Sequence, residues 1–339
     1  MTKKTIYIAY TGGTIGMKHS AQGFIPVSGH LQEQLRKMPE FHRPEMPTFV
    51  INEYEPIIDS SNMTPGDWQR IANDIQANYD KYDGFIILHG TDTMAFTASA
   101  LSFMLCNLTK PVIVTGSQIP LSELRSDGQS NLLNALYIAA NYPINEVTLF
   151  FNNKLMRGNR TIKANADGFD PFWSPNFTHL LEAGIDIHPL AYPALPHARP
   201  GNTLEVAEII PQPIGVVTLY PGISASIMRN FLQQPVKAIL LLTYGVGNAP
   251  QDPELLAEIR DAAKRGIIVV SLTQCIIGRV NMQGYATGHA LMESGVISGA
   301  DMTMEAALTK LHYLLSQNLG YDETCRLMQQ NLRGELTEI

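Results

Sequence analysis

Two short segments combine glycines with threonine hydroxyls, and each follows a run of apolar, β-forming residues. The first is TGGTI at residues 11–15, and the second is HGTDT at residues 89–93. Glycine permits a tight or left-handed backbone and a close approach of ligand, so the first segment leaves the Thr14 hydroxyl accessible. Taken singly, the first segment is equally well explained as a glycine-rich turn, and the second as the cap of a helix.

Three more polar segments lie at the ends of expected strands or before a capped helix. They are DSSN at residues 59–62, GSQ at residues 116–118 and RGNRTIKAN at residues 157–165. Ligands of open α/β sheets bind outside the carboxyl ends of the strands. Five polar loops at such positions, two of them with threonine hydroxyls, exceed what turn chemistry alone explains. A dinucleotide site is a poor alternative, because the first loop lacks G-x-G-x-x-G and residues 17–23 are expected to form a loop rather than begin a helix.

At these positions the chain resembles the bacterial-type L-asparaginases. TGGTI and HGTDT match the two signature motifs of that family, and the segments at 59–61, 116–117 and Lys163 follow in its order and spacing. The resemblance covers essentially the whole chain. It implies hydrolysis of L-asparagine to L-aspartate and ammonia through an acyl-enzyme intermediate, with no cofactor and no metal ion. The start of the chain lacks the apolar stretch of a signal peptide, which places it with the cytosolic type I group.

The resemblance also implies a role for each matching residue. Thr14 attacks the side-chain amide carbon of asparagine, and Thr91, Lys163 and Asp92 form a proton relay, because a threonine hydroxyl needs a neighbouring base. A lysine in a polar, partly dry site can lose its proton near neutrality. Backbone N–H groups near Thr91 and Ser117 form the oxyanion hole. The implied substrate-binding residues are Asp59, Ser60, Ser61, Thr91, Asp92 and Ser117.

Two positions depart from the family's pattern. The family usually has a tyrosine in the mobile loop after the first motif, and the matching lid residue here is Phe24. Some type I relatives are activated by asparagine at a second site, where this chain would use Thr273, Gln274 and Cys275. Those relatives supply an arginine at the position of Leu242. Without that charge-assisted contact to the effector's carboxylate, we expect weak activation or none.

The helices and strands that would position these loops are predicted to form an α/β fold, because short β-rich runs alternate with helical patterns. We expect a larger N-terminal domain with a mostly parallel sheet and flanking helices, and a smaller C-terminal α/β domain with a parallel sheet. Seven prolines interrupt periodicity between 175 and 213, which indicates a connection there. The expected boundaries are 1–190, a linker at 191–212, and 213–339. The expected strands are 5–10, 84–88, 112–115, 147–151, 214–220, 238–243 and 267–272, with capped helices after Thr64 and Asp252.

Composition sets the class of protein. The 339 residues are 45% hydrophobic and 16% charged, which is typical of a globular chain, and the net charge of -7 argues against nucleic acid. No apolar run reaches membrane length, and we expect a cytoplasmic protein. Three widely spaced cysteines predict buried free thiols. The nine histidines show no metal-ligand spacing, and His89 is expected to shape its loop. Asp301 and Glu305 are expected to be capping or surface acids.

Other functions on the same motifs stay open. The amidase subunit of a tRNA-dependent amidotransferase shares them, but normally carries an extra N-terminal domain, whereas here the first motif begins at residue 11. A non-catalytic amino-acid sensor would need neither nucleophile nor base. A minor glutaminase activity also stays open, because one methylene discriminates by only about 1–3 kcal/mol. The resemblance further implies a homotetramer built as a dimer of dimers, with residues 245–248 and 285–295 as candidates for completing the partner's site.

Overall fold

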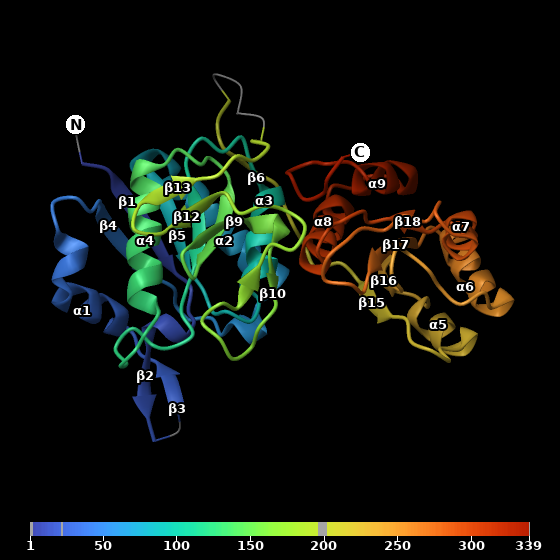
Figure 1. The fold of residues 1–339 in the computed structure, drawn as a ribbon, viewed down its shortest axis with the longest axis horizontal. Coiled ribbons are helices and arrows are strands. Elements are labelled where there is room, and N and C mark those ends of the chain that lie inside the picture. Colours follow the sequence, from blue (N-terminus) through green and yellow to red (C-terminus); the bar gives the residue numbers. More distant parts are fainter. Residues whose placement is uncertain (1–2, 22, 196–201, 339) are drawn as a thin grey trace. The chain divides into compact units, whose positions relative to one another are not determined.

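The computed structural model describes residues 3–21, 23–195 and 202–338 (Figure 1). The chain divides into two compact units, Met1–Ala207 and Glu208–Ile339. Residues 196–201 of the expected linker lie outside the described residues, and the boundaries at 190 and 213 stay a prediction. In the described part of the chain, each helix is too short or too polar to cross a bilayer.

The first unit is built on an eight-stranded sheet in the order β13-β12-β9-β8-β7-β5-β1-β4. Five neighbouring strands run parallel, and three more extend the sheet in antiparallel fashion. The parallel strands are β4 (Thr48–Glu53), β1 (Thr5–Tyr10), β5 (Gly84–Leu88), β7 (Val112–Thr115) and β8 (Val147–Phe151). The antiparallel strands are β9 (Lys154–Arg157), β12 (Leu181–Ala183) and β13 (Ile187–Pro189). Every residue of β5, β7 and β8 is buried, as expected for strands covered on both faces.

Helices cover both faces of this sheet. α1 (His30–Lys37) and α4 (Gly128–Asn141) pack with Ile6, Ile8 and Tyr10 of β1 in one apolar core. On the other face, α2 (Pro65–Asn78) approaches Tyr7, whose hydroxyl donates to Asp74, and α3 (Met94–Met104) packs beside α2. The 3-10 turns η1 (Thr14–Gly16), η2 (Pro39–His42), η3 (Ser60–Asn62), η4 (Tyr79–Lys81) and η5 (Gly158–Arg160) complete the loops.

The second unit has a parallel four-stranded sheet in the order β15-β16-β17-β18. Its strands are β15 (Ile214–Thr218), β16 (Ala238–Thr243), β17 (Ile268–Thr273) and β18 (Ile297–Ser298). Alternate side chains of β16 enter two cores. Ile239 and Leu241 face α5 (Ala225–Phe231), α6 (Pro253–Lys264) and α7 (Ala286–Glu293), and Leu240 faces α8 (Met304–Ser316) and α9 (Tyr321–Met328). The expected fold class, an α/β protein with a smaller second domain, is therefore confirmed.

Most expected elements agree with the structure at their ends. β1, β5, β7, β8 and β16 have the predicted bounds, β15 ends two residues early and β17 lies one residue later. α2 begins with a capping box, in which the Thr64 N–H donates to the Asp67 carboxylate at 2.8 Å. The Asp252 carboxylate caps α6 and accepts from Glu254 N at 2.9 Å.

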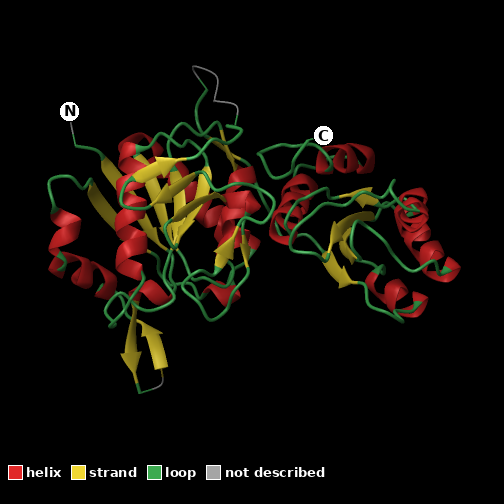
Figure 2. Cartoon of the chain, viewed as in Figure 1, coloured by secondary structure: helices red, strands yellow, loops and turns green. Residues whose placement is uncertain are grey.

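Some local expectations were wrong. Residues 17–20 are not a loop but strand β2 (Met17–Ser20), which pairs with β3 (Gly23–Pro26) in a hairpin that projects from the first unit (Figure 2). No residue of β3 is buried, so the alternating apolar signal of a strand is missing. The short strand β6 (Leu105–Cys106) follows α3 directly and pairs with β14 (Glu205–Val206).

Buried acids and thiols also differ from expectation. Both Glu305 and Asp301 are buried, so the expected surface position is wrong, whereas Glu305 does lie in the first turn of α8. Burial raises the pKa of Glu305 from 4.5 to about 7, while Asp301 accepts a hydrogen bond from the Thr337 N–H at 2.8 Å. All three cysteines are free thiols, as predicted, but Cys275 is exposed and Cys106 and Cys325 are only partly buried.

Candidate active site

The first motif begins where β1 ends, and its backbone is tied to the neighbouring strand. Thr11 donates to the Leu88 carbonyl from both its N–H and its hydroxyl, at 3.0 and 2.9 Å. Gly12 and Gly13 then take φ values of 148° and 93°, in the region that favours glycine. A Cβ on Gly12 would lie 2.0 Å from the Ile58 carbonyl oxygen. This close packing needs glycine, and it turns the chain directly into η1 at Thr14.

Three of the predicted loops pack into one cluster through glycine. A Cβ on Gly13 would lie 2.4 Å from Gly90 N, and a Cβ on Gly90 would lie 2.4 Å from the Ser60 Oγ. The Thr93 hydroxyl donates to the Ser60 carbonyl at 2.7 Å, which ties the second motif to η3. Thr14 and Thr91 are the residues that directly follow the touching glycines. The structure therefore brings both motifs and the 59–62 loop to one end of the parallel sheet.

Lys163 joins this cluster from a different part of the chain. It lies in β10 (Ile162–Lys163), which pairs with β11 (Phe172–Trp173). Its ammonium group donates to Thr91 Oγ1 at 3.0 Å and to Asp92 Oδ1 at 2.6 Å. Thr91 is buried, whereas the side chains of Lys163 and Asp92 are 21% and 63% exposed. The predicted relay residues are thus in direct contact, with Asp92 open to solvent.

Gln118 contacts the same hydroxyl, a contact that sequence reasoning missed. Thr91 donates to Gln118 Oε1 at 3.1 Å, and Gln118 Nε2 donates to the Gly168 carbonyl at 2.9 Å. The GSQ loop was recognised as polar, but only Ser117 was assigned a role in it. The Ser117 hydroxyl donates within its own loop, to the Ile119 carbonyl at 2.6 Å, and the oxyanion role of the backbone near Ser117 stays a prediction.

The 59–62 loop is held in a capped turn. The Asp59 carboxylate accepts from the Ser61 N–H at 3.0 Å, which starts η3. Ser60 is buried against Gly90, while Asp59 and Ser61 are exposed. Phe24 lies on the exposed strand β3 and contacts His19 rather than these residues. The two ring centroids are 5.5 Å apart in a T-shaped arrangement.

The four residues of the predicted second site come together in the second unit. Gln274 Nε2 donates to the Leu242 carbonyl at 2.8 Å. The Thr273 hydroxyl donates to the Gly245 carbonyl and accepts from the Cys275 N–H at 3.0 Å. Thr273 is the last residue of β17 rather than part of the following loop. The carboxyl ends of β16 and β17 therefore carry this cluster.

His89 is fully buried behind the second motif. Its Nδ1 lies 2.7 Å from the Gly90 carbonyl oxygen, and its Nε2 lies 2.8 Å from Thr97 Oγ1. Burial lowers the pKa of His89 from 6.5 to about 4, so the ring is neutral at physiological pH. A neutral, enclosed imidazole is suited to holding the loop rather than to exchanging protons with a substrate.

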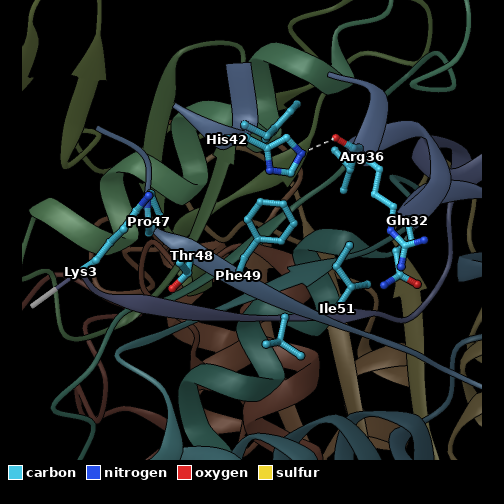
Figure 3. A pocket seen from close by; sticks show the side chains of 11 residues that line it. Lys3, Gln32, Arg36, His42, Pro47, Thr48, Phe49 and Ile51 are labelled. Atoms are coloured by element: carbon cyan, nitrogen blue, oxygen red, sulfur yellow. Dashed lines mark hydrogen bonds between the residues drawn. The ribbon is translucent and has the colours of Figure 1, made fainter. Parts of the chain in front are cut away.

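A cavity away from the predicted site residues lies at the edge of the first sheet. Its volume is about 440 Å³, and it opens between α1, η2 and β4, lined in part by Arg36, His42 and Phe49 (Figure 3). Its His42 Nε2 lies 3.1 Å from the Leu35 carbonyl oxygen. Among the residues that the structure describes, no group of three or more His, Cys, Asp or Glu could hold a metal ion.

Comparisons with known proteins agree across both units. Residues 5–193 match the family model described as Asparaginase, N-terminal, and residues 213–328 match the Glutaminase/Asparaginase C-terminal domain. The chain is 71% identical to L-asparaginase 1 of Escherichia coli (strain K12), over 99% of each chain. It is similar to the crystal structure of L-asparaginase I from Vibrio cholerae, with 66% identity and a TM-score of 0.93, over 99% of this chain and 100% of that chain. It is also 34% identical to a glutamyl-tRNA(Gln) amidotransferase polypeptide of Methanobrevibacter smithii, over 82% of this chain and 65% of that protein.

Proposed function

The chain belongs to the asparaginase family, and from this premise we propose that it is an L-asparaginase, which hydrolyses L-asparagine to L-aspartate and ammonia. The observation that carries the proposal is the contact of Lys163 with both Thr91 and Asp92, beside the loop of Thr14. A non-catalytic sensor would require no such arrangement of hydroxyl, amine and carboxylate. Glutamine, one methylene longer, is the expected minor substrate.

The proposed reaction uses Thr14 as nucleophile. Its hydroxyl oxygen bonds to the side-chain amide carbon of asparagine, and its proton passes to the relay of Thr91 and Lys163. The C–N bond then breaks, the proton goes to the leaving nitrogen, and ammonia departs. Water attacks the resulting ester by the same route, releasing aspartate and restoring Thr14. The short Lys163–Asp92 contact supports this relay, since it holds the amine at hydrogen-bond distance from Thr91.

The substrate's charged end would be held by the surrounding loops. The exposed Asp92 carboxylate takes the α-ammonium group, and Ser60 with nearby donors takes the α-carboxylate. Asp59, which caps η3, and Ser61 within η3 would bind at the same end. The oxyanion that forms on the amide oxygen is stabilised by backbone N–H groups near Thr91 and Ser117. Phe24 serves as lid residue in this proposal.

The remaining parts of the proposal concern assembly and location. We propose a cytoplasmic homotetramer, a dimer of dimers in which residues 245–248 and 285–295 complete the partner's site. Their support is the similarity to type I asparaginases across the whole chain. A protein that stays monomeric and fully active on dilution, followed by light scattering and ammonia release, would refute the shared site.

The decisive experiment is ammonia release from asparagine and glutamine over a wide concentration range, in the presence of a chelator. We expect turnover of asparagine without added metal or cofactor. Thr14→Ala should lower kcat by several orders of magnitude while the protein stays folded by circular dichroism. Binding of asparagine without ammonia release would instead identify a sensor, and Thr14→Ala with most of its activity would exclude Thr14 as nucleophile.

A further inference from the structure

Four groups behind the second motif form a continuous line of hydrogen bonds. The indole Nε1 of Trp68 donates to Thr97 Oγ1 at 3.2 Å. Thr97 Oγ1 lies 2.8 Å from His89 Nε2, and His89 Nδ1 lies 2.7 Å from the Gly90 carbonyl oxygen. All three side chains are buried, at 5%, 0% and 0% exposure for Trp68, Thr97 and His89. The line starts in α2, crosses α3 and ends on the backbone of the motif.

The position of each hydrogen in this line follows from the chemistry of its ends. A carbonyl oxygen only accepts, so the Nδ1 of His89 must carry the proton that faces Gly90. The buried ring is neutral, so its Nε2 is an acceptor and the Thr97 hydroxyl must donate to it. The Thr97 oxygen in turn accepts from Trp68, whose indole can only donate. Every donor therefore points toward the Gly90 carbonyl.

The orientation of that carbonyl also sets the orientation of an amide. The peptide bond between Gly90 and Thr91 is trans and planar, so its C=O and N–H point in opposite directions. Since His89 holds the Gly90 C=O from behind, the Thr91 N–H is directed away from His89. No described residue accepts a hydrogen bond from this N–H. The amide is therefore available to a ligand on the far side of the loop.

We propose that His89 is a positioning residue, which aims the Thr91 backbone N–H at the oxyanion that forms during amide hydrolysis. The inference rests on the proposed function, because it assigns the oxyanion contact of that reaction. The imidazole touches no reacting atom and acts through the Gly90–Thr91 peptide. Preorganised donors of this kind stabilise the transition state most when they are already aimed before the reaction begins.

The hydrogen bond from His89 is needed because the next residue, Gly90, is a glycine. Gly90 is packed between Gly13 and Ser60, where a Cβ would lie 2.4 Å from the Ser60 Oγ. Glycine is therefore required for space, but it also has the freest backbone of any residue. The hydrogen bond from His89 restricts the peptide at this position. The second motif thus combines a glycine that permits close packing with a histidine that orients the peptide it forms.

Two substitutions at His89 separate positioning from core filling. In His89→Asn the side-chain Nδ2 can take the place of Nδ1 and still donate to Gly90, whereas in His89→Gln the amide reaches the position of Nε2 and faces Thr97 instead. We expect His89→Asn to keep kcat within about tenfold of the wild type, and His89→Gln to fall at least about tenfold further, with KM for asparagine within about threefold in both. The side chain in His89→Asn is smaller than that in His89→Gln and leaves the larger cavity. We therefore expect His89→Asn to have the lower melting temperature but the higher kcat of the two variants. A kcat for His89→Gln equal to or above that of His89→Asn would overturn the proposal.

Thr97→Val provides a test that nearly preserves the shape of the core. It removes the hydroxyl that donates to His89 Nε2 and so keeps the ring proton on Nδ1. We expect about a tenfold loss of kcat with little change in KM. The matched control is Thr309→Val in α8, another fully buried hydroxyl, which donates to backbone carbonyls of its own helix. It should cost stability and leave kcat unchanged. Wild-type kcat in Thr97→Val would overturn the inference, whereas a wild-type protein that releases no ammonia from asparagine would instead defeat the proposed function.

Discussion

Removing the amine of Lys163 should separate activity from stability. Lys163→Met keeps an unbranched side chain of similar length in β10 but deletes both contacts of the ammonium group, to Thr91 at 3.0 Å and to Asp92 at 2.6 Å. The Asp92 side chain is 63% exposed, so its carboxylate is rehydrated once the lysine is gone. The substitution therefore leaves no buried charge without a partner.

The two expected effects differ in size. An exposed ion pair contributes about 0.2–1 kcal/mol, and the hydrogen bond to Thr91 about 1 kcal/mol more. For a unit of this size each kcal/mol lowers the melting temperature by about 2–4 °C. Loss of a general base costs about 10²–10⁴-fold in rate, or about 3–5 kcal/mol of transition-state stabilisation. We expect kcat to fall by that factor while the melting temperature drops by a few degrees.

The assay is ammonia release at saturating asparagine, paired with thermal unfolding of the same samples. Lys37→Met is the matched control, since Lys37 forms an ion pair with Glu33 at the same 2.6 Å in the same unit, remote in sequence from both motifs. It should keep wild-type kcat. The double variant Thr91→Val/Lys163→Met should be within about tenfold of the worse single variant, because groups that act as a unit are not additive.

Two outcomes would contradict this reasoning. If Lys163→Met keeps more than a tenth of the wild-type kcat, Lys163 is not the base of the relay. If the double variant loses the product of the two single losses, Thr91 and Lys163 act independently and do not share one proton path.

The second unit supplies three further predictions. Burial raises the pKa of Glu305 from 4.5 to about 7, so the folded state binds the carboxyl proton more tightly than the unfolded state does. The stability that the bound proton contributes is therefore lost as the pH rises from about 4.5 to about 7. Glu305→Gln should therefore raise the urea midpoint at pH 8 and change it little at pH 4.5; equal shifts at both would disprove the linkage. Lys310 and Glu335 form an ion pair at 2.5 Å with both side chains at 0% exposure. Glu335→Gln leaves the Lys310 charge buried without its partner, so it should lower the free energy of unfolding by about 3–5 kcal/mol. A urea midpoint unchanged from wild type would be inconsistent with this. Velocity should be close to hyperbolic in asparagine, whereas Leu242→Arg should introduce sigmoidicity; a sigmoidal wild-type curve would reverse that assignment.

Local features of the fold were predictable from the sequence. The strands β5, β7 and β8 are continuous apolar runs with polar residues at their ends, and their bounds agree with the prediction. The caps at Thr64 and Asp252 involve residues within three positions of each other, so their chemistry is visible in a short window. The edge strand β4 was missed, because its apolar run covers only Phe49, Val50 and Ile51.

The residue types of the candidate site were also recognisable, since their motifs follow those strands directly. Their mutual contacts were not. Lys163 is 72 residues from Thr91 in the chain, and it makes this contact from β10, which pairs with β11 in a separate two-stranded sheet. Gln118 is 27 residues from Thr91 and lies in a loop. The direction of a side chain in a loop cannot be predicted from sequence periodicity, as it can in a helix or strand.

The environment of single charged or polar groups was decided by packing alone. Glu305 has the sequence signature of a helix-capping acid, yet it is buried because the first turn of α8 lies in the core. The sequence by itself determined the buried parallel strands, the caps and the order of the motifs, because these depend on neighbours along the chain. Only the tertiary structure joined Trp68 and Thr97 to His89 behind the second motif. Such contacts depend on how α2 packs against α3, and this packing is set by the summed shape of many side chains rather than by any local pattern.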